Sequence, residues 1–466
     1  MSQSTAARVA RHQQLLRNHF TEQPQLPFGD LLTEQRFHEI VAEEEVSGRA
    51  CFFTPLMTVW GWLWQTLRSA SCWEAALACM TWALSRGQTA PSPENSAFCK
   101  ARCRLPERLL ARLARETGQK VSQKAGEWQW QGHRVRVADG TTVTMPDTKE
   151  NQRDYPQSSS QAPGLGFPIV RLVLVFCLAC GSALDMALGR WRGKGTGEAS
   201  LLHSLLDNLE KDDVLLADRY FSSYAIIALL QLRGIHYVGR GHASRTVDFR
   251  RGWQRGPRDH IVIWHKPAQS DLLDEAQWAQ LPDELWVREL EVRVTVRGFR
   301  VKRLVVVTTL LDADAYEAAD LAELYRTRWQ VELNLRSLKT IMGMDQLRCQ
   351  SPEMVRKELW NHLLAYNLVR STMVRAAQQT DGSPDAISYS GALQMLRNQS
   401  DDGPPLTDEL RALIEAAVLA AIAKRKVANR PNRIEPRAVK KRPKPYPRLR
   451  RPRSQCKRLL KSKLTA

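Results

Sequence analysis

Three acidic residues, Asp139, Asp218 and Glu332, have positions suited to the binding of hard metal ions. Asp139 follows the segment VRVA, Asp218 closes the apolar segment DVLLAD, and Glu332 lies within a segment that favours a helix. Two divalent cations ~4 Å apart can activate an attacking oxygen, stabilise the leaving oxygen and neutralise phosphate charge. Such cations prefer carboxylate oxygens from several chain elements. The three acids therefore meet the demands of metal-assisted phosphoryl transfer.

A second group of polar residues shares one side of a helix that we expect over residues 321–340, which contain no Pro or Gly. At about 100° per residue, Tyr325, Glu332 and Lys339 all fall within about 60° of Arg328. The other side carries five apolar residues: Leu324, Val331, Leu335, Leu338 and Met342. We expect the helix to pack by this apolar side. The carboxylate, the two cations and the phenol then lie at the border with solvent, where a metal ion and a phosphate can meet.

Each of these positions also has a plain structural explanation. Arg328 and Glu332 are four residues apart, and most such pairs are surface ion pairs that contribute little stability. Asp139-Gly140 after a strand is most often a turn. A histidine or cysteine metal site is a weaker alternative, because the ten His form no HxxxH or HxH pair and the nine Cys lack the paired spacing of a zinc site.

The charge of the chain indicates a polyanionic partner. The net charge is +19, and residues 424–466 hold eighteen Lys and Arg against one acid, Glu435, or +17. Nucleic acid is the simplest partner for such a protein. No apolar run approaches the ~20 residues of a membrane helix, and the first residues lack the apolar core of a signal peptide. We therefore expect a cytoplasmic protein with no membrane partner.

The secondary structure that we expect to position the acids differs between the first 120 residues and the part that follows. Residues 1–120 have helical apolar spacing and predict a helical domain for DNA binding or assembly; its basic segment 100–115 is either a DNA-facing or a solvated surface. Alternation then predicts strands at 127–139, 169–180 and 184–191. A helix at 199–209, a buried strand at 213–218 and a helix at 224–232 follow. This order, with acids closing the first and fourth strands, is that of an RNase H-like fold.

The fold class that we predict is therefore α/β. An RNase H-like core at 127–375 carries a β-rich insertion at about 235–300 and returns to a buried strand at 303–310. A helix pair at 351–375 is expected to brace the helix with Glu332. Residues 376–423 predict a linker and one helix, and residues 424–466 a basic tail that is disordered without a partner.

The residues around the three acids resemble those of a known family. VADGTTVTMPDT, LLADRYF and the spacing Y-x2-R-x3-E-x6-K are similar, in order, to the DDE domain of cut-and-paste insertion-sequence transposases with the Tyr-Arg-Glu-Lys signature. The likeness covers at least residues 130–370. It implies that Asp139, Asp218 and Glu332 are the catalytic, metal-binding acids. It also implies that Tyr325, Arg328 and Lys339 contact the DNA end.

The resemblance further implies a cofactor and partners. Two Mg²⁺ ions, for which Mn²⁺ can substitute, would serve cleavage at the terminal inverted repeats and joining of each 3′-hydroxyl to target DNA. The active form would be a homodimer or higher oligomer on DNA. In some relatives an aromatic residue of the insertion holds a flipped base, and Trp253, Trp264, Trp278 and Trp286 are the candidates. The alternatives are an RNase H-like nuclease or resolvase without strand transfer, and an inactive DNA-binding derivative of a transposase.

Overall fold

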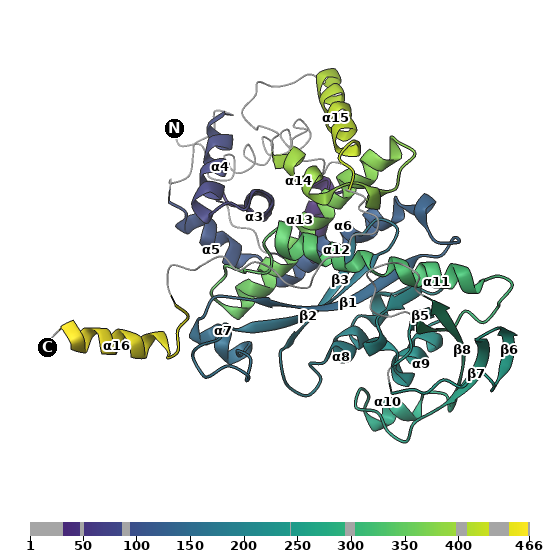
Figure 1. Ribbon diagram of the computed structural model, residues 1–466. Coiled ribbons are helices and arrows are strands. Elements are labelled where there is room, and N and C mark those ends of the chain that lie inside the picture. Colours follow the sequence, from purple (N-terminus) through teal and green to yellow (C-terminus); the bar gives the residue numbers. More distant parts are fainter. Residues whose placement is uncertain are drawn as a thin grey trace.

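The computed structural model of this chain describes residues 31–46, 51–85, 94–242, 244–293, 303–397, 408–427 and 447–464. Figure 1 shows a sheet that crosses the molecule, with the N-terminal helices and the long helix α13 on one side of it. The strands of the insertion lie at the far end from the N-terminal helices. Within the described ranges, no helix is both long enough and apolar enough to cross a membrane.

The N-terminal region is helical, as its apolar spacing predicts. Its helices are α2 (Glu34–Glu43), α3 (Pro55–Arg68), α4 (Cys72–Ser85), α5 (Ser96–Arg104) and α6 (Glu107–Gln123). The side chains of Thr33 and Thr54 accept N-terminal N–H groups of α2 and α3, and Pro55 occupies the first turn of α3. Ser69 ends α3 in the left-handed conformation, with φ of 56°.

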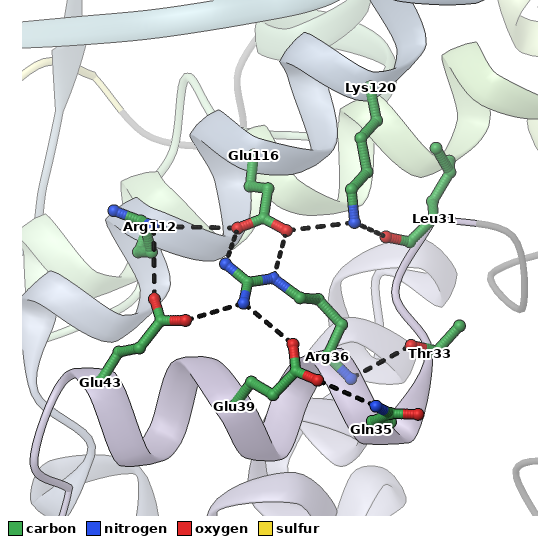
Figure 2. A network of polar contacts seen from close by, with 9 residues as sticks. All are labelled: Leu31, Thr33, Gln35, Arg36, Glu39, Glu43, Arg112, Glu116 and Lys120. Carbon is green, nitrogen blue, oxygen red and sulfur yellow. Dashed lines mark hydrogen bonds and ion pairs between the residues drawn. The ribbon is translucent and has the colours of Figure 1, made fainter.

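A network of ion pairs joins α2 to α6 (Figure 2). Arg36 donates to both carboxylate oxygens of Glu116, at 2.7 and 2.8 Å, and to Glu39 and Glu43 of its own helix. Lys120 donates to the carbonyl oxygen of Leu31 at 3.1 Å and pairs with Glu116 at 3.1 Å. Every carboxylate in this network forms an ion pair with at least one cation, and these pairs hold α2 against α6.

Nine strands form one mixed sheet in the order β3-β2-β1-β4-β5-β9-β8-β7-β6. They are β1 (Val135–Thr144), β2 (Ile169–Cys177), β3 (Ala183–Arg190), β4 (Val214–Ala217), β5 (His236–Arg240), β6 (Trp253–Gly256), β7 (Asp259–His265), β8 (Glu284–Arg293) and β9 (Arg303–Thr308). Strands β1 to β3 are antiparallel neighbours, whereas β4 and β5 run parallel to β1. This half of the sheet has the RNase H-like arrangement that the sequence predicts.

Short helices connect the strands of the core and the insertion. They are η1 (Gly126–Trp128), α7 (Lys149–Asp154), α8 (Glu198–His203), η2 (Leu206–Asn208), η3 (Arg219–Phe221), α9 (Tyr224–Leu232) and α10 (Glu275–Ala279). One face of the sheet shares a core with α8 and α9, to which Leu202 and Ile226 contribute. The other face shares a core with the N-terminal helices and α13, to which Trp62 and Leu364 contribute.

The C-terminal part consists of helices. They are α11 (Ala318–Thr327), α12 (Gln330–Arg336), a π-helical turn η4 (Ser337–Ile341), α13 (Pro352–Gln378), η5 (Pro384–Ala386), α14 (Tyr389–Arg397), α15 (Asp408–Ala423) and α16 (Arg453–Leu464). Helix α13 is buried along most of its length, contacts α3, α6, α14 and α15, and contains no helix-breaking residue after Pro352 at its start. It is therefore a single 27-residue helix, and the predicted helix pair is wrong.

One further boundary, the start of the insertion, differs from the sequence prediction. Strand β5 belongs to the core sheet, where it pairs in parallel with β4, so the insertion begins after Arg240 rather than at residue 235. The insertion does not form a separate module, because β9 pairs with both β5 and β8 and makes the sheet continuous. Long-range pairing of this kind leaves no mark on the local sequence.

The predicted linker and tail are more ordered than expected wherever the structure describes them. In the linker, Ala392, Leu393 and Leu396 of α14 are buried in the main core, because their spacing gives the helix one apolar side. In the tail, α16 forms where we expected disorder, and Figure 1 shows it projecting from the body of the molecule. Its residues are mostly good helix formers. Most of the remaining tail, at 428–446, lies outside the described residues.

Candidate active site

The pairing of β1 with β4 brings Asp139 and Asp218 together. The parallel ladder ends at the pair Ala138 and Ala217; Asp139 is the next residue of β1, and Asp218 is the first residue after β4. Val137 and Leu216, two residues before the aspartates, both lie in the core shared with α12 and α13. Because side chains alternate along strands, Asp139 and Asp218 point to this same face. Two distant aspartates thus become neighbours at the edge where β4 stops.

The turn that we expected at Asp139-Gly140 is absent from β1, which continues to Thr144. Gly140 to Thr144 remain paired with β2, and the β-branched residues Thr141, Thr142 and Val143 suit this extended path. Gly140 has a different role from a turn residue. A side chain there would lie 2.4 Å from the carboxyl carbon of Glu198, so glycine permits this close approach.

Glu332 reaches the two aspartates from α12, which contacts β1. The predicted apolar side is confirmed: Leu324, Val331 and Leu338 are all at most 1% exposed. The single helix expected over 321–340 is divided, however. Around Arg328 and Trp329 the N–H groups bond three residues back, and the N–H of Met342 bonds five residues back to Ser337. Packing against the sheet, rather than Pro or Gly, produces these tighter and wider turns.

The guanidinium of Arg328 lies among the three carboxylates. It is 3.3 Å from Glu332 and close enough to act electrostatically on Asp139 and Asp218. Burial raises the pKa of Asp139 to about 6, and the charges of Asp218 and Glu332 add to this effect. The N–H of Gly140, which donates to Asp139 at 2.8 Å, and Arg328 both act in the opposite direction. Arg328 is thus a cation that acts on all three acids, and its single charge does not balance theirs.

The carboxylates do not form a closed cluster in the structure. Among the described residues, no three His, Cys, Asp or Glu side chains are arranged so that they could hold a metal ion. The chemistry of the donor set nevertheless fits a hard divalent cation, because all three side chains supply oxygen ligands and their charge is not fully compensated. Arg328 occupies the position of a partial counter-ion.

The remaining predicted residues lie beside this group. Tyr325 is mostly buried on α11, and its pKa is raised by burial, with Asp218 contributing. Lys339 donates from η4 to the hydroxyl of Thr141 at 2.9 Å, which ties the π-helical turn to β1 two residues beyond Asp139. Burial lowers the pKa of Lys339. The structure thus brings all six predicted residues to one side of β1 and β4.

The four tryptophans of the insertion differ in exposure. Trp264 is buried and donates to Glu289 at 2.9 Å, and Trp278 packs edge-on against Tyr224. Trp253 and Trp286 are 51% and 44% exposed and stack on each other, with ring centroids 4.6 Å apart.

Sequence reasoning missed the residues that hold α12 in place. Buried Arg370 of α13 donates to the amide oxygen of Asn334, two residues after Glu332, and to the hydroxyl of Tyr366 at 2.8 Å. Tyr366 in turn donates to the carbonyl of Gly181 at 2.8 Å. No local pattern marks these residues. The bonds from Arg370 to Asn334 and from Tyr366 to Gly181 join segments that are distant in sequence, and the bond from Arg370 to Tyr366 has the spacing of an ordinary contact within a helix.

Comparison with known proteins gives consistent matches. The family model described as the transposase DDE domain matches residues 130–368. Transposase InsG of the insertion sequence IS4 from Escherichia coli K12 is 28% identical over 364 residues, covering 77% of this chain and 79% of InsG. The IS231F transposase of Bacillus thuringiensis subsp. israelensis is 23% identical over 282 residues, covering 53% of this chain and 57% of that protein.

A solved structure also aligns with the chain. The piggyBac transposase synaptic complex with hairpin DNA covers 87% of this chain and 86% of its own, at a TM-score of 0.43 and 11% identity. The family assignment depends on the DDE-domain match, which spans just over half of the 466 residues and contains Asp139, Asp218 and Glu332. The chain belongs to the family of transposases that carry a DDE domain.

Proposed function

We propose that this DDE transposase binds the terminal inverted repeats of an insertion sequence, cleaves at its ends and joins each 3′-hydroxyl to target DNA. Asp139, Asp218 and Glu332 are the catalytic residues in this proposal. The observation that carries it is the parallel register of β1 and β4, which makes two acids from different strands neighbours facing α12. The family establishes DNA transposition as the activity; the roles of the individual residues are our inference.

Membership of the family implies the use of a divalent metal ion. In our proposal Asp139, Asp218 and Glu332 would hold two Mg²⁺ ions, for which Mn²⁺ can substitute. Bound metal would neutralise phosphate charge and favour the attacking oxygen. The excess of carboxylate charge over nearby cations supports this assignment, because a cation would remove the mutual repulsion of the acids.

Arg328 and Lys339 act on the phosphate in this proposal. Arg328 compensates the carboxylates in the free protein and becomes available to the phosphate of the DNA end once a metal ion supplies that charge. Lys339 holds Thr141 and therefore keeps η4 close to Asp139 while it presents a charge to the DNA. The phenol of Tyr325 contacts the same DNA end. These roles extend the Tyr-Arg-Glu-Lys signature to this chain.

If a hairpin step occurs, its flipped base would bind at Trp253 and Trp286. Their exposure and mutual stacking support this choice, since a base can stack on an exposed indole face. Buried Trp264 offers no such face.

DNA is the partner in this proposal, and at least two copies of the chain hold the two ends. The basic tail adds affinity through counterion release without sequence preference. Helix α16 supports this role, because it presents Lys457, Arg458 and Lys461 to solvent beside exposed Leu460. Deletion of residues 424–466 is expected to weaken binding to all DNA sequences alike and to flatten its salt dependence; an unchanged salt slope would remove the tail from the interface.

An assay with labelled terminal repeats and a plasmid target tests the proposed reaction. The repeats are identified by sequencing the DNA that flanks the gene. Joined product in the presence of Mg²⁺ supports the full proposal. Cleavage without joining would instead indicate a nuclease or resolvase, and retarded DNA without either product an inactive DNA-binding derivative.

A further inference from the structure

A cavity lies between the N-terminal helices and the segment that follows η4. Its volume is about 790 Å³, and its walls come from α3, α5, the start of α7 and residues 342–362. None of the three proposed catalytic acids lines it. We call it the Arg102 cavity, after the cation in its wall.

Arg102 is a buried cation without an ionic partner. Its side chain lies over the ring of Trp62, with its guanidinium carbon 4.8 Å from the centroid, and it is only 9% exposed. One terminal nitrogen donates to the amide oxygen of Gln65 at 3.2 Å. The Nε atom is buried and has no hydrogen-bond partner. No ion pair to Arg102 occurs in the part of the chain that the structure describes.

Two carboxylates line the cavity without forming an ion pair with Arg102. Glu150 is exposed at the start of α7, and the carboxylate of Glu358 accepts the backbone N–H groups of Arg348 and Cys349, at 2.9 to 3.0 Å. Cys99 contacts Arg102 at 4.0 Å, and burial raises the pKa of its thiol, so the sulfur stays neutral near pH 7. A buried charge without a partner is unfavourable for folding. A negatively charged ligand would offset this penalty.

Two further cations belong to the same cavity. The guanidinium of Arg348 donates to the carbonyl oxygens of Ser69 and Ala70 and forms no ion pair with a carboxylate of the described residues. Lys149 is exposed at the start of α7 and lines the cavity as well. One buried and two more accessible cations in a cavity of this size suit a phosphate group carried on a larger molecule.

We propose that the Arg102 cavity binds a phosphate group, with the unpaired Nε–H of Arg102 as its innermost donor and with Arg348 and Lys149 as further cations. The phosphate belongs either to a DNA strand or to a free phosphate compound. Residues 342–354 of the cavity wall follow directly after η4, which carries Lys339. A DNA strand held at the proposed active site could therefore continue into the cavity. That source rests on the proposed function, whereas binding of phosphate itself does not.

Thermal unfolding of the full chain in inorganic phosphate tests the site. The reference is sodium chloride at equal ionic strength. Phosphate is expected to raise the melting temperature of the wild type above the chloride value. Arg102→Gln is expected to abolish this rise, and without phosphate to melt at the wild-type temperature or higher, because it removes an unpaired buried charge. A structural Arg102 would give the opposite result, with a lower melting temperature in both salts, and this would overturn the proposal.

Lys149→Gln provides a second test that does not depend on the stability of the Arg102 variant. It lies on the surface, so its melting temperature in chloride should equal that of the wild type, whereas phosphate should bind several-fold more weakly. Lys100→Gln is the matched control, because Lys100 is exposed on α5 but does not line the cavity. Equal phosphate effects in Lys149→Gln, Lys100→Gln and the wild type would also overturn the proposal.

Fluorescence anisotropy with a short random-sequence DNA duplex identifies the source of the phosphate. If the cavity binds DNA, Lys149→Gln and Arg102→Gln reduce the affinity and each lowers the salt slope by about one. If the ligand is a free phosphate compound, both variants bind phosphate more weakly than the wild type while their affinity for the duplex stays at the wild-type value. Neither measurement requires cleavage, so a failure of the proposed catalytic roles would be seen separately.

Discussion

The network around Arg36 and the group around Arg328 combine acidic and basic side chains in different proportions. In the first, Arg36, Arg112 and Lys120 face three glutamates (Figure 2). The hydrogen bond from Arg36, the largest influence, lowers the pKa of Glu116 to about 2. In the second, three carboxylates share Arg328, and burial raises the pKa of Asp139 to about 6. The first group is balanced by its own cations, whereas the acids of the second outnumber the guanidinium among them.

This difference separates a structural ion-pair network from a candidate metal site. The amount of carboxylate does not distinguish the two, because each group contains three acids. The ratio of cations to acids and the burial of Asp139 do distinguish them, and these set the direction of each pKa shift. Four measurements can contradict or refine this distinction.

The largest expected effect is on catalysis. Asp139→Asn, Asp218→Asn or Glu332→Gln should reduce end cleavage and joining on the order of a thousandfold or more, because each removes a proposed metal ligand while keeping the size of the side chain. DNA affinity should change little. Glu116→Gln, the matched control from the other network, should keep cleavage per folded molecule. Wild-type cleavage by any of the three variants would exclude that residue from the site.

The second effect is stabilisation by metal ions. Mg²⁺ at about 100 times its dissociation constant should stabilise the folded protein by about 2.7 kcal/mol. We expect a rise of a few degrees in the melting temperature of the wild type. Asp139→Asn should show little of this rise, and Glu116→Gln all of it. Equal rises in the wild type and in Asp139→Asn would place the stabilising metal ion elsewhere.

The third effect is the pH dependence that Asp139 produces without metal. Its folded-state pKa of about 6 lies above the unfolded value of about 4. The folded state therefore binds the proton more tightly, and stability increases as the pH falls from about 7 to about 4. Relative to Asp139→Asn, the wild type should gain about 2 kcal/mol over this range in urea unfolding with a chelator. A constant difference between the two proteins would contradict the raised pKa.

The smallest effect is that of Glu116, and its sign is opposite. Its folded-state pKa of about 2 lies below the unfolded value, so its contribution is present above about pH 4.5 and is lost as the pH falls toward 2. Glu116→Gln should reduce the free energy of unfolding by about 1 kcal/mol at pH 7 and by less at pH 3, since the carboxylate is partly exposed. Urea unfolding at both pH values measures this. An equal loss of unfolding free energy at pH 7 and pH 3 would show that Glu116 stabilises the protein through packing rather than through its charge.

The sequence determined the chemistry of the proposed site and much of the local structure. The acids at 139, 218 and 332, the Tyr-x2-Arg-x3-Glu spacing and the apolar side of the helix are all local patterns. The structure bears out that apolar side and most strands and helices of the core. The strand expected at 127–139 is shorter, because it begins at Val135 after the turn η1, and the helix expected at 199–209 ends at His203. The resemblance to DDE transposases depended on these short segments, and the family match confirms it.

Tertiary structure alone decided how these parts meet. Asp139 lies within a strand rather than at a turn, because β2 continues to pair with β1 after β4 has ended. The tight turn at Arg328 and the π-helical turn at Lys339 arise where α11 and α12 pack on the sheet, and the bond from Lys339 to Thr141 spans 198 residues. The unpaired Arg102 and the cavity beside it likewise depend on contacts between distant segments. Local residue types specify which groups are present, whereas burial and charge balance depend on partners that only folding brings into contact.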